Sequence, residues 1–273
     1  MGAARDPETA VMSISGRGRI LARCLAVVLC VLPAGCATRA KITSIAQLEE
    51  GTFAVVSGTV ADQLVLSRFP RAKLTYYNTA LDACMAVKSG KADAAGYDEP
   101  ILRNIAAKNP GLTVLPEKVT TDDYGFAVQL ENRELKATID AVVAELRRDG
   151  TYAAMMERWL PRTGSPAPMP DVASGGSAGI LRLGTAAVTE PFAFVDGSGG
   201  VVGFDIELAR HVARRLDKRL EVVNMDFGGL IPALIAGKVD MIAACITITE
   251  ERAGRVLFSE TYYTGGISAL VRE

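Results

Sequence analysis

Residues 225–253 read MDFGGLIPALIAGKVDMIAACITITEERA, a helix-forming segment followed directly by an apolar run. Leu230 to Ala236 is typical of a short buried helix, and Gly237 ends it. The charged turn Gly237-Lys238-Val239-Asp240 leads into the run Val239 to Ala244, which is typical of a strand buried on both faces. A helix that feeds at once into such a strand predicts an α/β fold with a parallel sheet.

The same pattern occurs once more, earlier in the chain. The predicted helix Ala80 to Lys88 is followed by Gly90-Lys91-Ala92-Asp93 and by the apolar strand Ala92 to Tyr97. One such turn is common in α/β proteins and carries little information alone. Residues 161–179, PRTGSPAPMPDVASGGSAG, separate the two copies, and their proline, glycine and serine content predicts a flexible linker. We therefore predict two similar lobes, from residues 41–160 and 180–273.

The first forty residues have the pattern of an export signal. Three arginines between Arg17 and Arg23 precede the apolar run Cys24 to Leu32, which is shorter than the roughly 20 residues that span a bilayer. We predict a signal over residues 1–40, and hence a location in the periplasm or cell envelope. An uncleaved membrane anchor is the alternative.

The end of this signal, Ala34-Gly35-Cys36, resembles the bacterial lipoprotein signal, in which the cysteine is lipidated and anchors the protein to the membrane. Pro33 departs from that pattern, which usually has a leucine there. Cys36 is thus the candidate lipidation site, and both Met1 and Met12 are candidate starts.

Composition excludes several classes of function. The 273 residues are 49% hydrophobic and 22% charged with a net charge of −1, which gives no basic excess for binding nucleic acid. The one histidine, His211, lies in a helical pattern, which argues against a histidine-based metal site or catalytic triad. Outside the signal, Cys84 and Cys245 have no metal-ligand spacing and are expected to be small core residues. We predict no cofactor and no metal.

Polar groups follow the predicted strands at the edge where open parallel sheets bind ligands. Asp98 follows the strand Ala92 to Tyr97, and Thr247 and Arg252 follow the strand Val239 to Ala244. Residues 57–59 follow another strand and open a helix, whose free N–H groups favour an anion. Arginine holds a carboxylate with two hydrogen bonds, and aspartate accepts from an ammonium group, so the set suits a zwitterion. Asp98 as a helix cap and Arg252 as a solvated charge remain the alternatives.

Two aromatic residues are candidates for apolar contacts with such a ligand. Phe192 and Phe227 each lie in a loop just past a predicted strand. Packing in the core is an equally good interpretation of either residue.

These residues resemble the bacterial extracellular solute-binding proteins of family 3, the polar amino-acid receptors of ABC transporters. The second half of the chain resembles the first half of that family, and the first half of the chain resembles its second half. The matching stretches are residues 183–185 (LGT), 190–194 (EPFAF), 202–209 (VGFDIELA), 227–234 (FGGLIPAL), 246–252 (ITITEER) and 258–263 (FSETYY), with residues 58–59 (GT), 92–94 (ADA), 98–100 (DEP), 124–128 (YGFAV) and 149–152 (DGTY).

The resemblance implies a two-lobed periplasmic-binding-protein fold of type II and a role for each candidate. Arg252, with Thr247 and Thr59, would hold the ligand α-carboxylate, and Asp98 the α-amino group. Phe227 would stack on the ligand side chain, with Phe192 nearby.

The sequence departs from the family pattern where the ligand side chain would lie. The family often has an aspartate at 186, an aromatic at 189, a small residue or proline at 190, and glycine or serine at 245. This chain has Ala186, Thr189, Glu190 and Cys245, and Glu190 is the seventh candidate ligand contact. The resemblance therefore does not carry over a specific amino acid.

The reversed order of the halves has two interpretations. The chain is either a circularly permuted receptor, whose residues 161–179 join the old ends, or the tail of one receptor and the head of the next in a tandem array. In either case Tyr124 to Gln129 and Ile267 to Arg272 are the predicted hinge strands.

The resulting hypothesis is capture of a small polar ligand, an amino acid, for uptake through an ABC transporter permease. The chain is expected not to be an enzyme. The alternatives are a ligand-sensing module of a signalling system, a dehydratase-like enzyme with Glu190 as its one candidate acid, and a scaffold lipoprotein.

Overall fold

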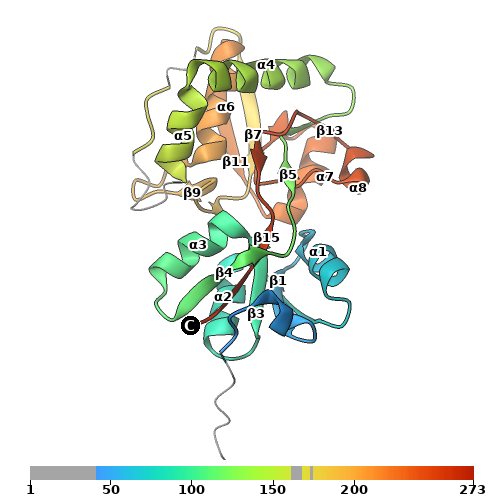
Figure 1. Ribbon diagram of the computed structural model, residues 1–273. Helices are drawn as coiled ribbons and strands as arrows, with labels where there is room; N and C mark the ends of the chain where they lie inside the picture. The colour runs from blue at the N-terminus through green and yellow to red at the C-terminus, as the bar shows by residue number, and fades with distance from the viewer. Residues whose placement is uncertain (1–40, 161–167, 173–174) are drawn as a thin grey trace, which may run out of the picture. The chain divides into compact units, whose positions relative to one another are not determined.

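The computed structural model describes residues 41–160, 168–172 and 175–273 (Figure 1). Residues 40–273 form one compact unit. The predicted signal over residues 1–40, including Cys36, lies outside the described residues. Within the part that is described, no helix is long and apolar enough to cross a membrane.

One five-stranded sheet, with its helices, forms what we call lobe 1. Its strand order is β2-β1-β3-β15-β4, in which β1, β2 and β3 are parallel and β15 runs antiparallel to β3 and β4. The strands are β1 (Thr52–Val56), β2 (Lys73–Tyr77), β3 (Ala94–Asp98), β4 (Leu112–Lys118) and β15 (Ile267–Arg272). The helices are η1 (Ile45–Leu48), α1 (Ala61–Arg68), α2 (Ala80–Lys88) and α3 (Glu99–Lys108).

A second five-stranded sheet, of order β11-β7-β12-β6-β13, forms lobe 2. Its strands are β6 (Ala127–Val128), β7 (Ile180–Thr185), β11 (Arg219–Asn224), β12 (Met241–Ile242) and β13 (Leu257–Phe258). The small sheet β8 (Val188–Thr189), β9 (Ala193–Val195) and β10 (Val201–Val202) belongs to this lobe. Its helices are α4 (Arg133–Asp149), α5 (Thr151–Trp159), α6 (Phe204–Arg215), η2 (Phe227–Gly229), α7 (Leu230–Ile235) and α8 (Glu250–Ala253).

The helix α4 shows how the sequence builds lobe 2. Its larger apolar residues recur every three or four positions and are buried against the core: Leu135, Ile139, Val142, Val143 and Leu146. Asn132 caps its first turn by accepting from the amide of Leu135 at 3.1 Å, and Gly150 ends it with a φ of 85°. The carboxylate of the buried Glu207 then ties α5 to α6, because it accepts from both Arg158 and the indole of Trp159.

Each sheet includes a strand from the other half of the chain. From β4 the chain passes through β5 (Asp123–Tyr124) into β6 of lobe 2, and from β13 it returns through β14 (Tyr263–Thr264) into β15 of lobe 1. The two crossings lie side by side, because β5 and β14 pair antiparallel (Figure 1). The predicted hinge strands thus lie in or beside these two crossings.

One predicted strand needs correction. Tyr124 to Gln129 is not continuous, because β5 pairs with β14 whereas β6 pairs with β12 and β13. The intervening backbone of Gly125 and Phe126 bonds instead to Ile246 and to the Ser259 side chain. A pattern of apolar residues does not reveal such a change of pairing partner.

The described residues of the segment predicted to be a linker contact lobe 2. Val172 is buried, Met169 packs on the core, and the amide of Gly176 donates to Asp217 at 3.3 Å. This segment leaves α5 and enters β7, two elements of the same lobe.

Candidate ligand-binding site between the lobes

A small cavity lies where the two lobes meet. Lobe 1 lines it with Thr59, Val60, Ala61, Tyr97, Asp98 and Ile267, and lobe 2 with Phe227, Cys245, Thr247 and Arg252. Five of the seven predicted ligand contacts, Thr59, Asp98, Phe227, Thr247 and Arg252, are among these residues. Its volume of about 10 Å³ is close to the minimum for one water molecule. An amino acid can therefore enter only if the lobes separate.

Arg252 is a buried cation that forms no ion pair with any described residue. It lies in the short helix α8, which is capped by the Thr249 hydroxyl, and its side chain is turned back into the cavity. One guanidinium nitrogen donates to the backbone oxygen of Thr247 at 3.0 Å, and the guanidinium carbon lies 5.4 Å from the centre of the Phe227 ring. Among the described residues, no carboxylate oxygen lies within 4.0 Å of its nitrogens. Burial lowers the pKa of Arg252, and Asp98 opposes that effect.

Asp98 ends β3 and is 7% exposed. It stands at the N-cap position of α3, but its side chain makes no capping hydrogen bond, so the alternative that it caps this helix is wrong. Its carboxylate instead accepts from the hydroxyl of Tyr124. Burial raises the pKa of Asp98 to about 6, and the bonds from Tyr124 and its own backbone oppose that rise.

Thr59 lines the cavity at the entry to α1. Its hydroxyl donates to the Val56 carbonyl at 2.8 Å and accepts from the Ala61 amide at 3.3 Å. Both hydrogen bonds of the hydroxyl therefore stay within the turn that leads into α1. Gly58 before it has a φ of 75°, and a Cβ built there would lie 3.6 Å from the Cα of Gly228 in lobe 2. The lobes meet closely at these two glycines.

Sequence reasoning missed Tyr97, and it predicted Cys245 to be a core residue at a position where the family usually has glycine or serine. Cys245 is free and buried, but it lines the cavity with a φ of 50°, a backbone conformation that few non-glycine residues adopt. Burial raises the pKa of its thiol well above the usual range, which makes it a poor nucleophile. The signal in the sequence was its position directly after the predicted strand, where Thr247 and Arg252 were found.

The two remaining predicted residues do not line this cavity. Phe192 is fully buried in an aromatic cluster, with its ring centre 5.2 Å from that of Tyr263 and 6.3 Å from that of Tyr124. Glu190 forms an ion pair between the lobes, 2.6 Å from the nitrogen of Lys108.

A second, larger cavity of about 720 Å³ adjoins the first, because Tyr97 and Phe227 line both. Its other lining residues are Val56, Ser57, Asn78, Thr79, Ala80, Ala186, Ala187, Val188, Thr189, Asn224, Met225, Asp226 and Gly228. They include one carboxylate, Asp226, and no lysine or arginine.

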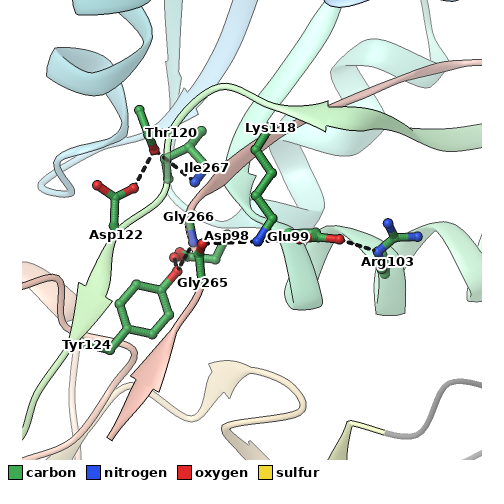
Figure 2. Close-up of polar contacts among 10 residues, drawn as sticks. All are labelled: Asp98, Glu99, Arg103, Lys118, Thr120, Asp122, Tyr124, Gly265, Gly266 and Ile267. Atoms are coloured by element: carbon green, nitrogen blue, oxygen red, sulfur yellow. Dashed lines mark hydrogen bonds and ion pairs between the residues drawn. The ribbon is translucent and has the colours of Figure 1, made fainter. Parts of the chain in front are cut away.

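A polar network behind the cavity joins Asp98 to both crossings (Figure 2). The Tyr124 hydroxyl donates to Asp98 and accepts from the amide of Gly266 at 3.2 Å. Beside it, Lys118 lies 2.9 Å from Glu99 and donates to the Gly265 carbonyl at 3.1 Å.

The described residues contain no group of three or more His, Cys, Asp and Glu side chains that could hold a metal ion.

Comparison with known proteins gives a match to a family model over part of the chain. Residues 181–273 match the model of the bacterial extracellular solute-binding proteins, family 3. Over 93 residues the chain is 42% identical to the arginine-binding extracellular protein ArtP of Bacillus subtilis, covering 33% of this chain and 36% of that protein. Over 83 residues it is 37% identical to the lysine/arginine/ornithine-binding periplasmic protein of Escherichia coli, covering 30% and 32%. The chain thus spans about a third of the length of these relatives.

Among solved structures, the arginine-bound form of domain 1 from TmArgBP is 43% identical, with a TM-score of 0.32, covering 36% of this chain and 82% of that one. These relatives are named as binding proteins, not as enzymes. Residues 181–273, about a third of the chain, are thus similar to the bacterial extracellular solute-binding proteins of family 3.

Proposed function

We propose that the chain captures an amino acid outside the cytoplasm, between its two lobes, and delivers it to the permease of an ABC transporter. The observation that carries this proposal is the buried guanidinium of Arg252, which has no acidic partner among the described residues and shares one cavity with Asp98. A buried cation without a partner is costly, and an incoming carboxylate would remove that cost. The α-ammonium group of the same ligand would bind Asp98.

The relatives support an amino acid as the ligand. Their names give arginine, lysine and ornithine as what they bind. The second cavity refines the class of side chain, since it adjoins the proposed α-carboxylate site and its one fully charged group is the acid Asp226. We infer a preference for basic or neutral polar side chains over acidic ones. Ala186 and Thr189 line the same cavity, at positions where the family often has other residues. The contacts to the ligand side chain would therefore differ from those in other members of the family.

A thermal-shift screen of the purified chain against the twenty amino acids and citrulline tests the proposal. A ligand at 100 times its dissociation constant adds about 2.7 kcal/mol to the free energy of unfolding. Arg252→Ala should abolish this shift, because it removes the partner of the ligand carboxylate. Arg255→Ala is the matched control, since Arg255 lies on the exposed side just after α8. A shift that survives in Arg252→Ala would refute the assigned role.

We also propose how the chain is divided into segments. We infer a signal over residues 1–40 with Cys36 as the lipidation site and a linker over 161–179. Residues 41–160 would correspond to the second-lobe segment of the family with its C-terminal helices, and residues 180–273 to its first-lobe segment. The strands exchanged between the two halves favour the permuted order over the tandem one. One ligand per monomer in calorimetry and sedimentation would support the permuted order, and binding by a dimer alone would contradict it. Mass spectrometry of the membrane-bound protein tests for a lipid on Cys36.

A further inference from the structure

The side chain of Tyr124 joins lobe 1 to both of the crossings between the lobes. Tyr124 is fully buried in β5, within the first crossing. Its hydroxyl donates to Asp98 of lobe 1 and accepts from the amide of Gly266, in the second crossing (Figure 2). Its backbone bridges to Thr247, a lobe 2 residue of the same cavity.

The second crossing is shaped around this side chain. A Cβ on Gly265 would lie 2.6 Å from the Tyr124 hydroxyl oxygen and 2.9 Å from the ring carbon that bears it. Gly266 has a φ of 129°, which an L-residue rarely adopts, and a Cβ there would lie 2.1 Å from the Thr120 carbonyl oxygen. The absence of side chains at both positions lets the Tyr124 hydroxyl reach the backbone amide of Gly266.

We propose that Tyr124 is a positioning residue. Its hydroxyl couples the state of the Asp98 carboxyl, ionised or protonated, free or bound to a ligand, to the backbone of the second crossing at Gly266. The part of this inference that concerns ligand rests on the proposed function, in which Asp98 holds the ammonium group. A hydroxyl that donates to a carboxylate becomes a better acceptor, so its bond from Gly266 is strongest when Asp98 is ionised. Coupling of this kind is reciprocal: a change at the crossing alters Asp98 by the same free energy.

The groups around Asp98 determine how readily its carboxyl ionises. Arg252 of lobe 2 favours its ionised form, and Asp122 of the first crossing disfavours it. Tyr97, Tyr263 and Cys245 also face it, and their own pKa values are raised, first by burial, so they stay neutral near pH 7. Tyr124 is neutral for the same reason, and its hydrogen bond lowers the pKa of Asp98 against the rise that burial causes.

The first experiment uses the full chain without ligand and compares Tyr124→Phe with Tyr263→Phe. Both variants keep an aromatic ring and lose one hydroxyl. Tyr263 packs against Tyr124, with ring centres 5.7 Å apart. In Tyr124→Phe the NMR titration midpoint of the Asp98 carboxyl should rise by about one pH unit, because a bond to the charged form is lost. The amide of Gly266 should exchange its hydrogen about tenfold faster. Neither value should change in Tyr263→Phe.

The second experiment adds L-arginine and measures its dissociation constant by calorimetry between pH 5.5 and 8. In wild type the affinity should fall as the pH falls through the pKa of Asp98, about 6, because the protonated carboxyl no longer accepts from an ammonium group. In Tyr124→Phe this midpoint should move upward with that of Asp98, and binding at pH 7 should weaken by about two- to tenfold.

The outcomes separate the two proposals. If no amino acid binds to wild type, the proposed function fails, while the measurements without ligand still decide the role of Tyr124. An Asp98 titration and a Gly266 exchange rate that are the same in wild type and Tyr124→Phe would overturn the inference, as would equal effects of Tyr263→Phe. Should Tyr124→Phe not fold, Asp98→Asn replaces it: faster Gly266 exchange at pH 7 supports the coupling, and unchanged exchange overturns it.

Discussion

Charged residues buried in this chain divide into those with partners and those without. Glu207 is satisfied by Arg158 and Trp159, so its role is to hold two helices together. Arg252 has no carboxylate partner among the described residues and lines a cavity. A structural role explains the first residue but not the second, and this contrast is what makes Arg252 the centre of the proposed site.

Asp205 is a third case, a fully buried acid at the start of α6. One carboxylate oxygen accepts from the amide of Cys245 at 3.1 Å, and the Tyr262 hydroxyl also faces this carboxyl and lowers its pKa against the effect of burial. Burial raises the pKa of Asp205 to about 7. The folded state therefore holds a proton that the unfolded state releases near pH 4, so the carboxyl destabilises the fold progressively as the pH rises from about 4 to 7.

Asp205→Asn should remove this dependence. At pH 5 the carboxyl is still largely protonated in the folded state, so its penalty is only partly present there. The free energy of unfolding of the variant, relative to wild type, should therefore rise by about 1–3 kcal/mol between pH 5 and pH 8. Urea titrations of both proteins at the two pH values measure the difference. A constant difference would mean that Asp205 titrates as an exposed carboxyl.

At the scale of single residues, the rule that ligands meet the carboxyl ends of parallel strands located most of the candidate site from sequence. The rule predicts Asp98, Thr247 and Arg252, and all three line the cavity. Phe192 and Glu190 lie in the region between β7 and α6, where short irregular elements follow one another, and nothing in the sequence there fixes which way a side chain points. Tyr97 was missed because neighbouring residues on a strand normally face opposite sides.

At the scale of elements, the helices and most strands follow from periodicity, whereas the crossings do not. α2 and β15 have the predicted bounds, because each is a continuous segment with one set of neighbours. β5 and β6 are two residues each and owe their existence to partners more than 100 residues away. Local sequence cannot specify such pairings, and the glycines around them are the only local sign.

Gly266→Ala tests how tightly the second crossing is built. The added methyl would meet the Thr120 carbonyl oxygen and the Cα of Thr121, at 2.1 and 2.9 Å, and neither is a side-chain atom that can rotate away. Gly111→Ala is the control, because its φ of 89° is also positive but no atom lies within 4 Å of the added methyl. Gly111→Ala should cost about 1–2 kcal/mol of unfolding free energy from conformation alone, and Gly266→Ala clearly more. If denaturant titrations gave equal losses of unfolding free energy for the two variants, the backbone of the second crossing would be able to shift and make room for the methyl group.

At the scale of the whole molecule, one ion pair among the described residues links the two lobes, in addition to the crossings. Lys108 at the end of α3 in lobe 1 lies 2.6 Å from Glu190, between β8 and β9 in lobe 2. Both side chains are partly solvated, at 57% and 25% exposure, so the pair contributes about 1 kcal/mol or less. A contribution of that size does not decide folding, but it is enough to change the ratio of open to closed molecules several-fold.

Lys108→Ala should therefore shift the chain toward the open arrangement without unfolding it. X-ray scattering in the absence of ligand should give a larger radius of gyration for the variant at low salt, and wild type should approach the same value at 1 M NaCl, where the pair is screened. Arg71→Ala is the control, since Arg71 pairs with Glu49 and Glu50 inside lobe 1. Exchanging the charges, with Lys108→Glu and Glu190→Lys together, should restore the wild-type radius of gyration. The attraction depends on the two charges being opposite, and it is the same whichever lobe carries the positive one. If the exchanged pair stays as open as Lys108→Ala, the effect comes from lost packing of the lysine stem, and closure is governed by the crossings alone.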